Sequence, residues 1–220
     1  MMKPLKNYNM PRQFNINKAT IGLMLLIITC SFLISCAVKN KSAQPESNMN
    51  FNNKKILMVI APKDFRDEEY LEPRKIFEQN GIIVKVASIQ SGVATGADGA
   101  KVKIDLTVSQ VEVNDYDAVV FVGGPGMAEI LNDESMQLLA KKFYQANKLT
   151  TAICVAPAIL AKAGILSGKQ ATVWSGVVSD LAAGGAIYLK EKVVQDGQLI
   201  TASGPAAAVS FTEKIVQSLK

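Results

Sequence analysis

The chain has 220 residues, of which 49% are hydrophobic and 20% are charged, and this balance excludes a chain that is disordered throughout. The formal net charge is +5, which taken alone would indicate a nucleic-acid partner. Four of the 24 basic residues lie within residues 1–36, which contain no acid, so the remainder carries 20 basic against 19 acidic residues. The basic character belongs mostly to this leader, and no nucleic-acid partner is expected.

Residues 1–36 have the form of a secretory leader. A positively charged start is followed by an apolar run, Ala19 to Ser35, that ends at Cys36. The last four residues, "LISC", resemble the bacterial lipobox, in which the cysteine is acylated and becomes the first residue of the mature chain. The run is also near the lower limit for spanning a bilayer, roughly 17–25 residues, so an uncleaved N-terminal anchor is the alternative. Either prediction places the domain in the cell envelope, outside the cytoplasm on a membrane. Ala37 follows Cys36 in place of the aspartate that often retains bacterial lipoproteins at the inner membrane, so the lipoprotein alternative indicates the outer membrane if the cell has one.

Residues 37–53 are polar, rich in Asn and Ser, and show no apolar periodicity, which is typical of a flexible tether. The globular domain is expected to span residues 54–220. Removal of Cys30 with the leader and acylation of Cys36 would leave Cys154 as the one free thiol of the mature chain. An intramolecular disulfide is then excluded, even in an oxidising compartment.

From residue 54 onward, strand-like and helix-like segments alternate. The predicted strands are residues 55–61, 82–88, 117–122, 150–154 and 171–174. The predicted helices are residues 67–81, 133–147, 155–166 and 204–220, and the predicted hairpins are residues 92–108 and 192–202. This alternation predicts a single-domain, doubly wound α/β fold of the flavodoxin-like kind, in which helices sandwich a mainly parallel sheet.

Local signals predict where several of these elements begin and turn. Asp67 and Asp133 are expected to be N-caps of their helices. Pro73 should kink the first helix or delay its start. The dipeptide Asp196-Gly197 is expected at the turn of the second hairpin.

Three features should meet at the carboxyl ends of the strands, where ligands bind in such sheets. They are an acidic cluster within residues 64–72, the loop "GGPG" at residues 123–126, and Cys154 at a strand-to-helix turn. Unpaired backbone N–H groups at such a turn favour the thiolate and are expected to lower the pKa of the thiol below about 8.5. The alternative is an inert buried cysteine that acts as a small hydrophobe.

The other two features also allow two interpretations each. The glycine loop lacks the spacing and the lysine of a Walker loop, so nucleotide binding is weakly supported; it forms either part of an oxyanion hole or only a tight turn. Most of the acidic residues should be solvated, since acids in a first turn complement the helix dipole. Only a carboxylate that points inward would take part in chemistry.

Four ordered motifs across residues 54–220 resemble the DJ-1/PfpI superfamily, which has the class I glutamine amidotransferase-like fold. The motifs are Glu69 with Pro73, the pair Gly123 and Gly124, the run Ala152, Ile153, Cys154 and Pro157, and the late run Asp196, Gly197, Ile200, Thr201, Gly204 and Pro205. The resemblance implies that Cys154 is the elbow nucleophile and that Glu69 is the acid beside its sulfur. It also implies backbone N–H groups near Gly124 and Val155 that face the reacting oxygen, and a homodimer.

The chain departs from that pattern where some members carry histidine. Val155 follows the cysteine in place of His, and the chain contains no His at all, so a Cys-His dyad is impossible and peptidase and glutamine amidotransferase activities are disfavoured. Trp174 stands where the deglycase branch has a pocket His, and Ser203 stands where it has Arg. A pocket lined by Trp174 and Pro125 is therefore expected to be more apolar than in that branch.

The sequence thus predicts an envelope-tethered lipoprotein with a reactive cysteine, Cys154, whose partner is a small electrophile or oxidant. Its activity would be stress- or redox-responsive, or glyoxalase- or deglycase-like on small α-oxoaldehydes, with Glu69 moving the proton. The alternative is a non-catalytic sensor or ligand-binding domain on the same scaffold. No cofactor is expected, and no metal, because the chain has no His and its mature form would keep one free Cys.

Overall fold

The computed structural model describes residue 51 and residues 53–219. Residues Met49–Lys220 form one compact unit, distinct from Met1–Asn48. Phe51 is buried against the core of this unit, and its carbonyl accepts a hydrogen bond from the Lys54 amide at 2.7 Å. The predicted leader, the lipidation site Cys36 and nearly all of the predicted tether lie outside the described residues.

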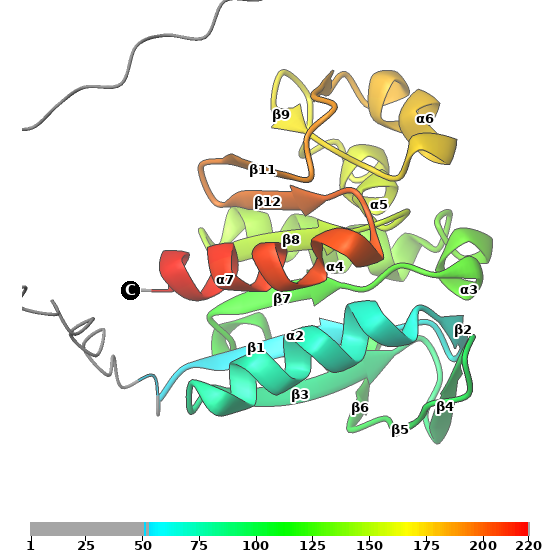
Figure 1. Cartoon of the computed structure of the whole chain (residues 1–220), viewed down its shortest axis with the longest axis vertical. Coiled ribbons are helices and arrows are strands. Elements are labelled where there is room, and N and C mark those ends of the chain that lie inside the picture. Colours follow the sequence, from blue (N-terminus) through cyan, green and yellow to red (C-terminus); the bar gives the residue numbers. More distant parts are fainter. Residues whose placement is uncertain (1–50, 52, 220) are drawn as a thin grey trace, which may run out of the picture. The chain divides into compact units, whose positions relative to one another are not determined.

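The centre of the domain is a seven-stranded sheet with the order β11-β12-β8-β7-β1-β3-β6 (Figure 1). Its strands are β1 (Lys55–Val59), β3 (Ile83–Ser88), β6 (Leu106–Thr107), β7 (Ala118–Phe121), β8 (Leu149–Ile153), β11 (Val193–Asp196) and β12 (Leu199–Ala202). Every neighbouring pair is parallel except β11 and β12, which form an antiparallel hairpin. The predicted doubly wound, mainly parallel α/β fold is confirmed.

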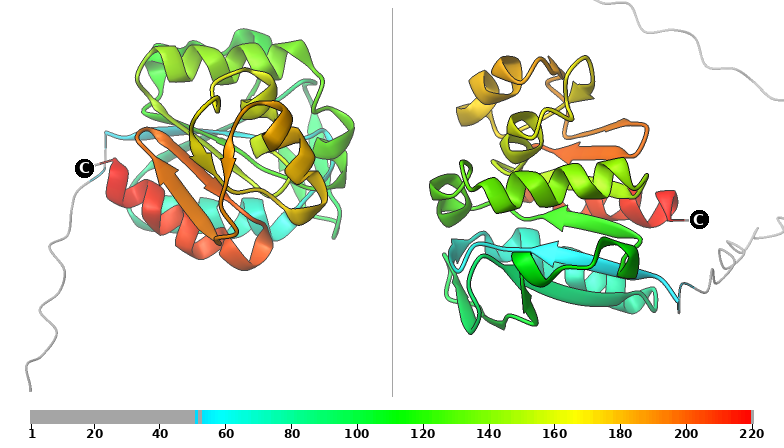
Figure 2. Two further views of the ribbon diagram at one scale, coloured as in Figure 1. Left: turned by 90° about the horizontal axis from the view of Figure 1, so that it is seen from above. Right: turned by 180° about the vertical axis from the view of Figure 1, so that it is seen from behind.

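Helices cover both faces of the sheet (Figure 2). Helices α2 (Asp67–Gln79) and α7 (Ala208–Ser218) pack together on one face, and α4 (Glu134–Gln145) and α5 (Pro157–Lys162) lie on the other. Short helices complete the connections: α3 (Pro125–Glu129), α6 (Val178–Ala183), η1 (Val108–Gln110), η2 (Val113–Asp115), η3 (Ser175–Val177) and η4 (Pro205–Ala207). The continuous apolar runs of the sequence follow from this layering, because the central strands are covered on both sides.

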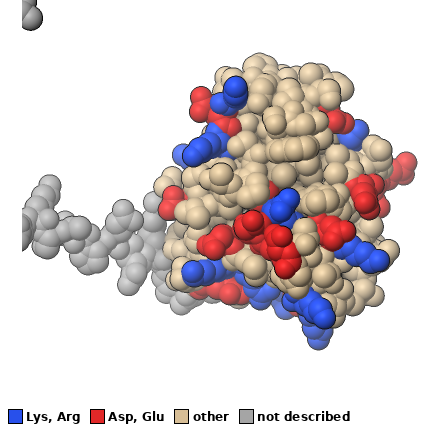
Figure 3. Space-filling model, turned by 45° about the vertical axis from the view of Figure 1, so that its right-hand side comes forward, with Lys and Arg blue, Asp and Glu red and all other residues tan. Residues whose placement is uncertain are grey.

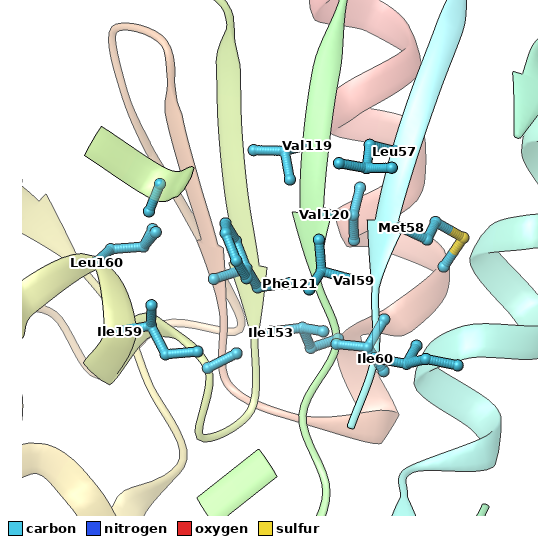
Figure 4. Close-up of a cluster of buried hydrophobic side chains, with 14 of the residues drawn as sticks. Leu57, Met58, Val59, Ile60, Val119, Val120, Phe121, Ile153, Ile159 and Leu160 are labelled. Carbon is cyan, nitrogen blue, oxygen red and sulfur yellow. The ribbon is translucent and has the colours of Figure 1, made fainter. Parts of the chain in front are cut away.

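The core lies along the central strands (Figure 4). All four residues of β7 and the last four of β1 are fully buried, and Ile153 and Leu160 pack around the same cluster. The buried strands β1, β7 and β8 form a rigid support for the loops that follow them. The loops that leave their carboxyl ends are therefore held in fixed positions relative to one another.

Two small sheets lie outside the main one. Strands β2 (Lys63–Phe65), β4 (Val93–Gly96) and β5 (Lys101–Lys103) form one, in which β4 and β5 are the predicted first hairpin. Strands β9 (Gln170–Ala171) and β10 (Ile187–Tyr188) form the other. The predicted strand 171–174 does not join the main sheet. Its amides are used elsewhere: the N–H of Thr172 donates to the Thr201 hydroxyl at 2.9 Å, and that of Trp174 donates to the Cys154 carbonyl at 2.8 Å.

Asp133 caps α4 as predicted, accepting hydrogen bonds from the amides of Ser135 and Met136 at 2.9 and 3.2 Å. The prediction for Asp67 was wrong. Helix α2 begins at this residue with Arg66 as its N-cap, and the Asp67 carboxylate is engaged by two amides of the β4–β5 loop instead. The Asp67 carboxylate therefore accepts hydrogen bonds from amides distant in the sequence, and not from the first-turn amides of α2 that an N-cap would bind.

Two further local predictions differ in detail. Pro73 lies inside a continuous helix that runs from Asp67 to Gln79, so it does not delay the start of α2. In the late hairpin, Asp196 is paired with Leu199, so the two-residue loop is Gly197-Gln198 and lies one residue later than predicted. The Asp196 carboxylate accepts a hydrogen bond from the Gln170 amide at 3.0 Å, which ties the hairpin to β9.

Candidate active site

Cys154 lies immediately after β8 with a left-handed backbone conformation, φ +63°. Its N–H donates to the Ala202 carbonyl at 2.9 Å, and its carbonyl accepts from the Trp174 amide at 2.8 Å. This conformation costs a residue with a Cβ atom about 1–2 kcal/mol, and such strain is concentrated at functional sites. Two neighbouring segments therefore hold the cysteine in a strained elbow, with its side chain 8% exposed.

Glu69, in the first turn of α2, supplies a fully buried carboxyl group beside this thiol. Its Oε2 accepts a hydrogen bond from the Gly123 amide at 3.0 Å. Its Oε1 is buried and has no hydrogen-bond partner among the described residues. Burial raises the pKa of Glu69 to about 7, against lowering contributions from the Cys154 thiol, the Gly123 amide and the charge of Arg66.

The Cys154 thiol is shifted in the direction opposite to the one predicted. Burial, the negative charge of Glu69 and the closeness of that carboxylate raise the thiol pKa to about 12, although the backbone N–H groups of Gly124 and Val155 lower it. The expectation of a pKa below 8.5 considered the elbow amides alone and omitted burial and the carboxylate. Protonation of Glu69 removes the repulsion, so the two groups hold their protons as a coupled pair.

The glycine loop packs closely against both the Cys154 side chain and the Glu69 carboxyl group. A Cβ atom on Gly123 would lie 2.5 Å from the Cβ of Cys154 and 2.7 Å from Oε2 of Glu69, which is too close for any side chain. Gly124 has φ +116°, and the backbone at Asp64 and Arg66 packs directly against it. The Arg66 amide also donates to the Gly123 carbonyl at 3.0 Å. Glycine at these two positions is what allows both catalytic candidates to approach one loop.

The structure thus brings together Cys154, Glu69 and the backbone of Gly124 and Val155, as the motifs implied. Most of the acidic cluster is solvated as expected: Asp64, Glu68 and Glu72 are exposed, whereas Asp67 and Glu69 are buried. Sequence reasoning missed the steric role of Gly123 and the charge of Arg66 near Glu69. The available signal for Arg66 was its position as the one cation between the acids Asp64 and Asp67.

The two residues predicted to line a pocket lie at the surface next to the elbow and the loop. Pro125 is exposed at the first position of α3, and the Trp174 side chain is 48% exposed with its ring against Gly176. Figure 3 shows one face of the domain, on which charged side chains are sparser in the upper part than in the lower half. Within the described residues, no group of three or more His, Cys, Asp or Glu is arranged to hold a metal ion. Those residues also contain no helix long and apolar enough to cross a membrane.

Comparison with known proteins places this geometry in a family. The DJ-1/PfpI family matches residues 54–218. An uncharacterized protein of Methanocaldococcus jannaschii is 42% identical over 201 residues, 90% of this chain and 97% of its own. Deglycase PfpI of Pyrococcus furiosus is 30% identical over 164 residues, 74% of this chain and 99% of its own.

Solved structures agree with the sequence matches. The crystal structure of a ThiJ/PfpI domain protein from Brachyspira murdochii superposes with a TM-score of 0.74 at 39% identity and covers 75% of this chain and 95% of that one. DJ-1beta of Drosophila melanogaster gives a TM-score of 0.68 at 29% identity, covering 76% of this chain and 90% of that one. The chain belongs to the DJ-1/PfpI family.

Proposed function

We propose that this protein is a cysteine-dependent enzyme of the glyoxalase or deglycase type that acts on small α-oxoaldehydes such as methylglyoxal. The observation that carries the proposal is the buried carboxyl group of Glu69, with a pKa of about 7, beside the Cys154 thiol on a strained elbow. Relatives named as deglycases, at 29–31% identity, support the reaction class.

Glu69 acts as the general base in this proposal. A base is most effective when its pKa lies near the working pH, and a pKa of about 7 meets that condition. The thiol is protonated at rest, and the carboxylate takes its proton as the sulfur attacks the aldehyde carbon. The S–C bond forms, the carbonyl electron pair moves to oxygen, and the amides of Gly124 and Val155 face the developing charge. Glu69 then returns the proton to that oxygen, which gives a hemithioacetal.

The same carboxyl group can complete an internal redox reaction. It removes the proton from the former aldehyde carbon and delivers a proton to the neighbouring ketone carbon, while the hydroxyl proton of the first carbon passes to the ketone oxygen. The first carbon is thereby oxidised to a thioester and the second is reduced to an alcohol. Water then cleaves the thioester to a 2-hydroxy acid and restores the thiol. No external oxidant or reductant enters, and no step needs imidazole.

A non-catalytic ligand-binding or sensor role is the second candidate. It is favoured by one observation, the half-exposed indole of Trp174. An apolar ligand could rest there without any covalent step at Cys154. Turnover separates the two candidates, because a binding domain consumes no substrate.

The direct test is production of 2-hydroxy acid from methylglyoxal by the full chain in detergent, with Cys30→Ser and Cys36→Ser so that Cys154 is its single thiol. The proposal predicts turnover that is abolished by Cys154→Ser and reduced at least about 100-fold by Glu69→Gln, the size typical of a lost general base. Glu68→Gln, an exposed neighbour, is the matched control and should keep the activity. Turnover that survives Cys154→Ser would refute the proposal.

We also propose that Cys36 is acylated and tethers a homodimeric domain to the cell envelope. The support is the leader of residues 1–36, its lipobox-like ending and the polar segment after it. Metabolic labelling with a radioactive fatty acid should mark the chain, and Cys36→Ser should remove the label while Cys30→Ser keeps it. A chain that stays unlabelled in all three forms but remains in the membrane would indicate an uncleaved anchor instead. Light scattering of the purified chain tests the dimer.

A further inference from the structure

A cleft lies between helix α2 and strand β5, apart from the Cys154 site. Its volume is about 380 Å³, and its walls include Leu71, Arg74, Lys101, Val102, Lys103 and Asp105. This volume lies in the range of roughly 300–1,000 Å³ that is typical of small-molecule sites. Cys154, Glu69, Gly124 and Val155 do not contribute to the lining of this cleft.

Two of the charged groups in the cleft already have partners. The Asp105 carboxylate accepts a hydrogen bond from the Val86 amide at 2.8 Å and lies 3.8 Å from the Lys85 ammonium. The Arg74 guanidinium donates to Glu78 at 2.8 Å and also contacts the hydroxyl of Tyr70. These charges are compensated within the protein.

The two lysines are not compensated. Lys101 and Lys103 alternate along β5 with the buried Val102, so both side chains lie on the same exposed face of the strand. Neither forms an ion pair with any of the residues that the structure describes. With Arg74 and Asp105 included, the cleft keeps an excess of two positive charges.

The strand that carries the lysines is held firmly. The Asp67 carboxylate accepts hydrogen bonds from the amides of Asp98 and Ala100 at 2.9 and 2.8 Å, and the Ala97 amide donates to the Phe65 carbonyl at 2.9 Å. A ligand therefore meets a preformed wall and does not have to order a loop, which lowers the cost of binding.

We propose that this cleft binds a small phosphate-bearing molecule. Its dianion would lie between the Lys101 and Lys103 ammonium groups, and its organic part would rest on Leu71, whose side chain is 47% exposed at the wall. Two uncompensated cations match the charge of one phosphate. The concave shape suits a small molecule that is enclosed on two sides by α2 and β5.

The test is calorimetric titration of the full chain with phenyl phosphate, inorganic phosphate and phenol at low salt. Phenyl phosphate should bind most tightly, phosphate more weakly and phenol not measurably, and added salt should weaken binding because it screens the charges. The double variant Lys101→Gln/Lys103→Gln should weaken phenyl phosphate binding by roughly tenfold or more. Lys141→Gln/Lys142→Gln makes the same change of net charge on exposed positions of α4, on the other face of the sheet, and should leave binding unchanged.

Three results would overturn the proposal. Equal weakening by both double variants would mean that only the overall charge attracts the anion. Binding of phenol as tight as that of phenyl phosphate would mean that the lysines play no part. Loss of binding in Cys154→Ala would place the ligand at the thiol site. Since none of these readouts depends on turnover, the result is independent of the proposed enzymatic activity.

Discussion

Cys154 and Asp64 are two non-glycine residues with left-handed backbone, at φ +63° and +51°, and both pack against the same glycine loop. Cys154 presses its Cβ toward Gly123, whereas Asp64 packs its carbonyl against Gly124. Asp adopts this conformation several-fold more readily than most residues, but Cys has no such tolerance. The left-handed conformation therefore costs little at Asp64 and more at Cys154, the residue that carries the thiol.

The largest effect is expected from filling the space that Gly123 leaves beside Cys154 and Glu69. Gly123→Ala places a methyl group against both Cys154 and Glu69, and it should lower the free energy of unfolding by about 3 kcal/mol or more and suppress alkylation of the thiol. Denaturant unfolding and thiol alkylation measure the two effects.

Gly168→Ala is the control for this prediction. Gly168 has φ +70° but open space around it, so an alanine there adds backbone strain without a clash. Its expected cost is about 1 kcal/mol. Equal costs at the two glycines would show that the loop tolerates a side chain and that Gly123 does not act as a spacer.

The carboxyl group of Glu69, beside Cys154, should make the stability of the protein depend on pH. The native Glu69 carboxyl has a pKa of about 7 and the unfolded one about 4.5, so the native state holds more protons between these values. Stability from this group is therefore fully present below pH 4.5 and is lost as the pH rises through 7. The loss should reach up to about 3 kcal/mol.

Glu69→Gln cannot ionise, and it should remove this contribution. The difference in unfolding free energy between wild type and Glu69→Gln, measured in urea at several pH values, should shift against the wild type as the pH rises from 4.5 to 8. Glu68→Gln, at an exposed position, should show no such trend. A difference that stays constant with pH would contradict the raised pKa.

A smaller effect separates the strain from the chemistry at Cys154. Both Cys154→Ala and Cys154→Gly remove the thiol, but only glycine relieves the left-handed conformation. The glycine variant should be about 1 kcal/mol more stable than the alanine variant, measured by thermal unfolding. A more stable alanine variant would mean that the elbow is not strained.

The smallest effect is expected at Asp64. Because Asp tolerates this conformation, Asp64→Gly should change the stability by no more than a few tenths of a kcal/mol. Thermal unfolding in parallel with the Cys154 pair measures it. If Asp64→Gly raised the stability as much as glycine does over alanine at Cys154, the two left-handed residues would be equally strained, which would contradict this account.

Much of the fold followed from the sequence because apolar runs and helix signals act locally. The strands at residues 55–61 and 117–122, the cap at Asp133 and the turn at Cys154 all depend on neighbours within a few residues. The failures depend on distant groups. Asp67 is engaged by amides about 30 residues away, and Trp174 is diverted from strand pairing by the carbonyl of Cys154.

The site shows the same division. The motifs singled out Cys154 and Glu69, and the structure places the two side chains next to each other. The direction of the thiol pKa could not be obtained in this way, because burial and the facing carboxylate are properties of the assembled fold. A cleft formed by α2 and β5 was also invisible in the sequence, where its walls are about 30 residues apart.

The measurement that tests the central claim most directly is the rate of alkylation of Cys154 against pH in the full chain with Cys30→Ser and Cys36→Ser. If Glu69 is the base for the thiol, the wild-type rate should rise with an inflection near pH 7, and Glu69→Gln should lose that inflection and react more slowly. A single inflection near the ordinary thiol value of about 8.5 in both proteins would contradict the account.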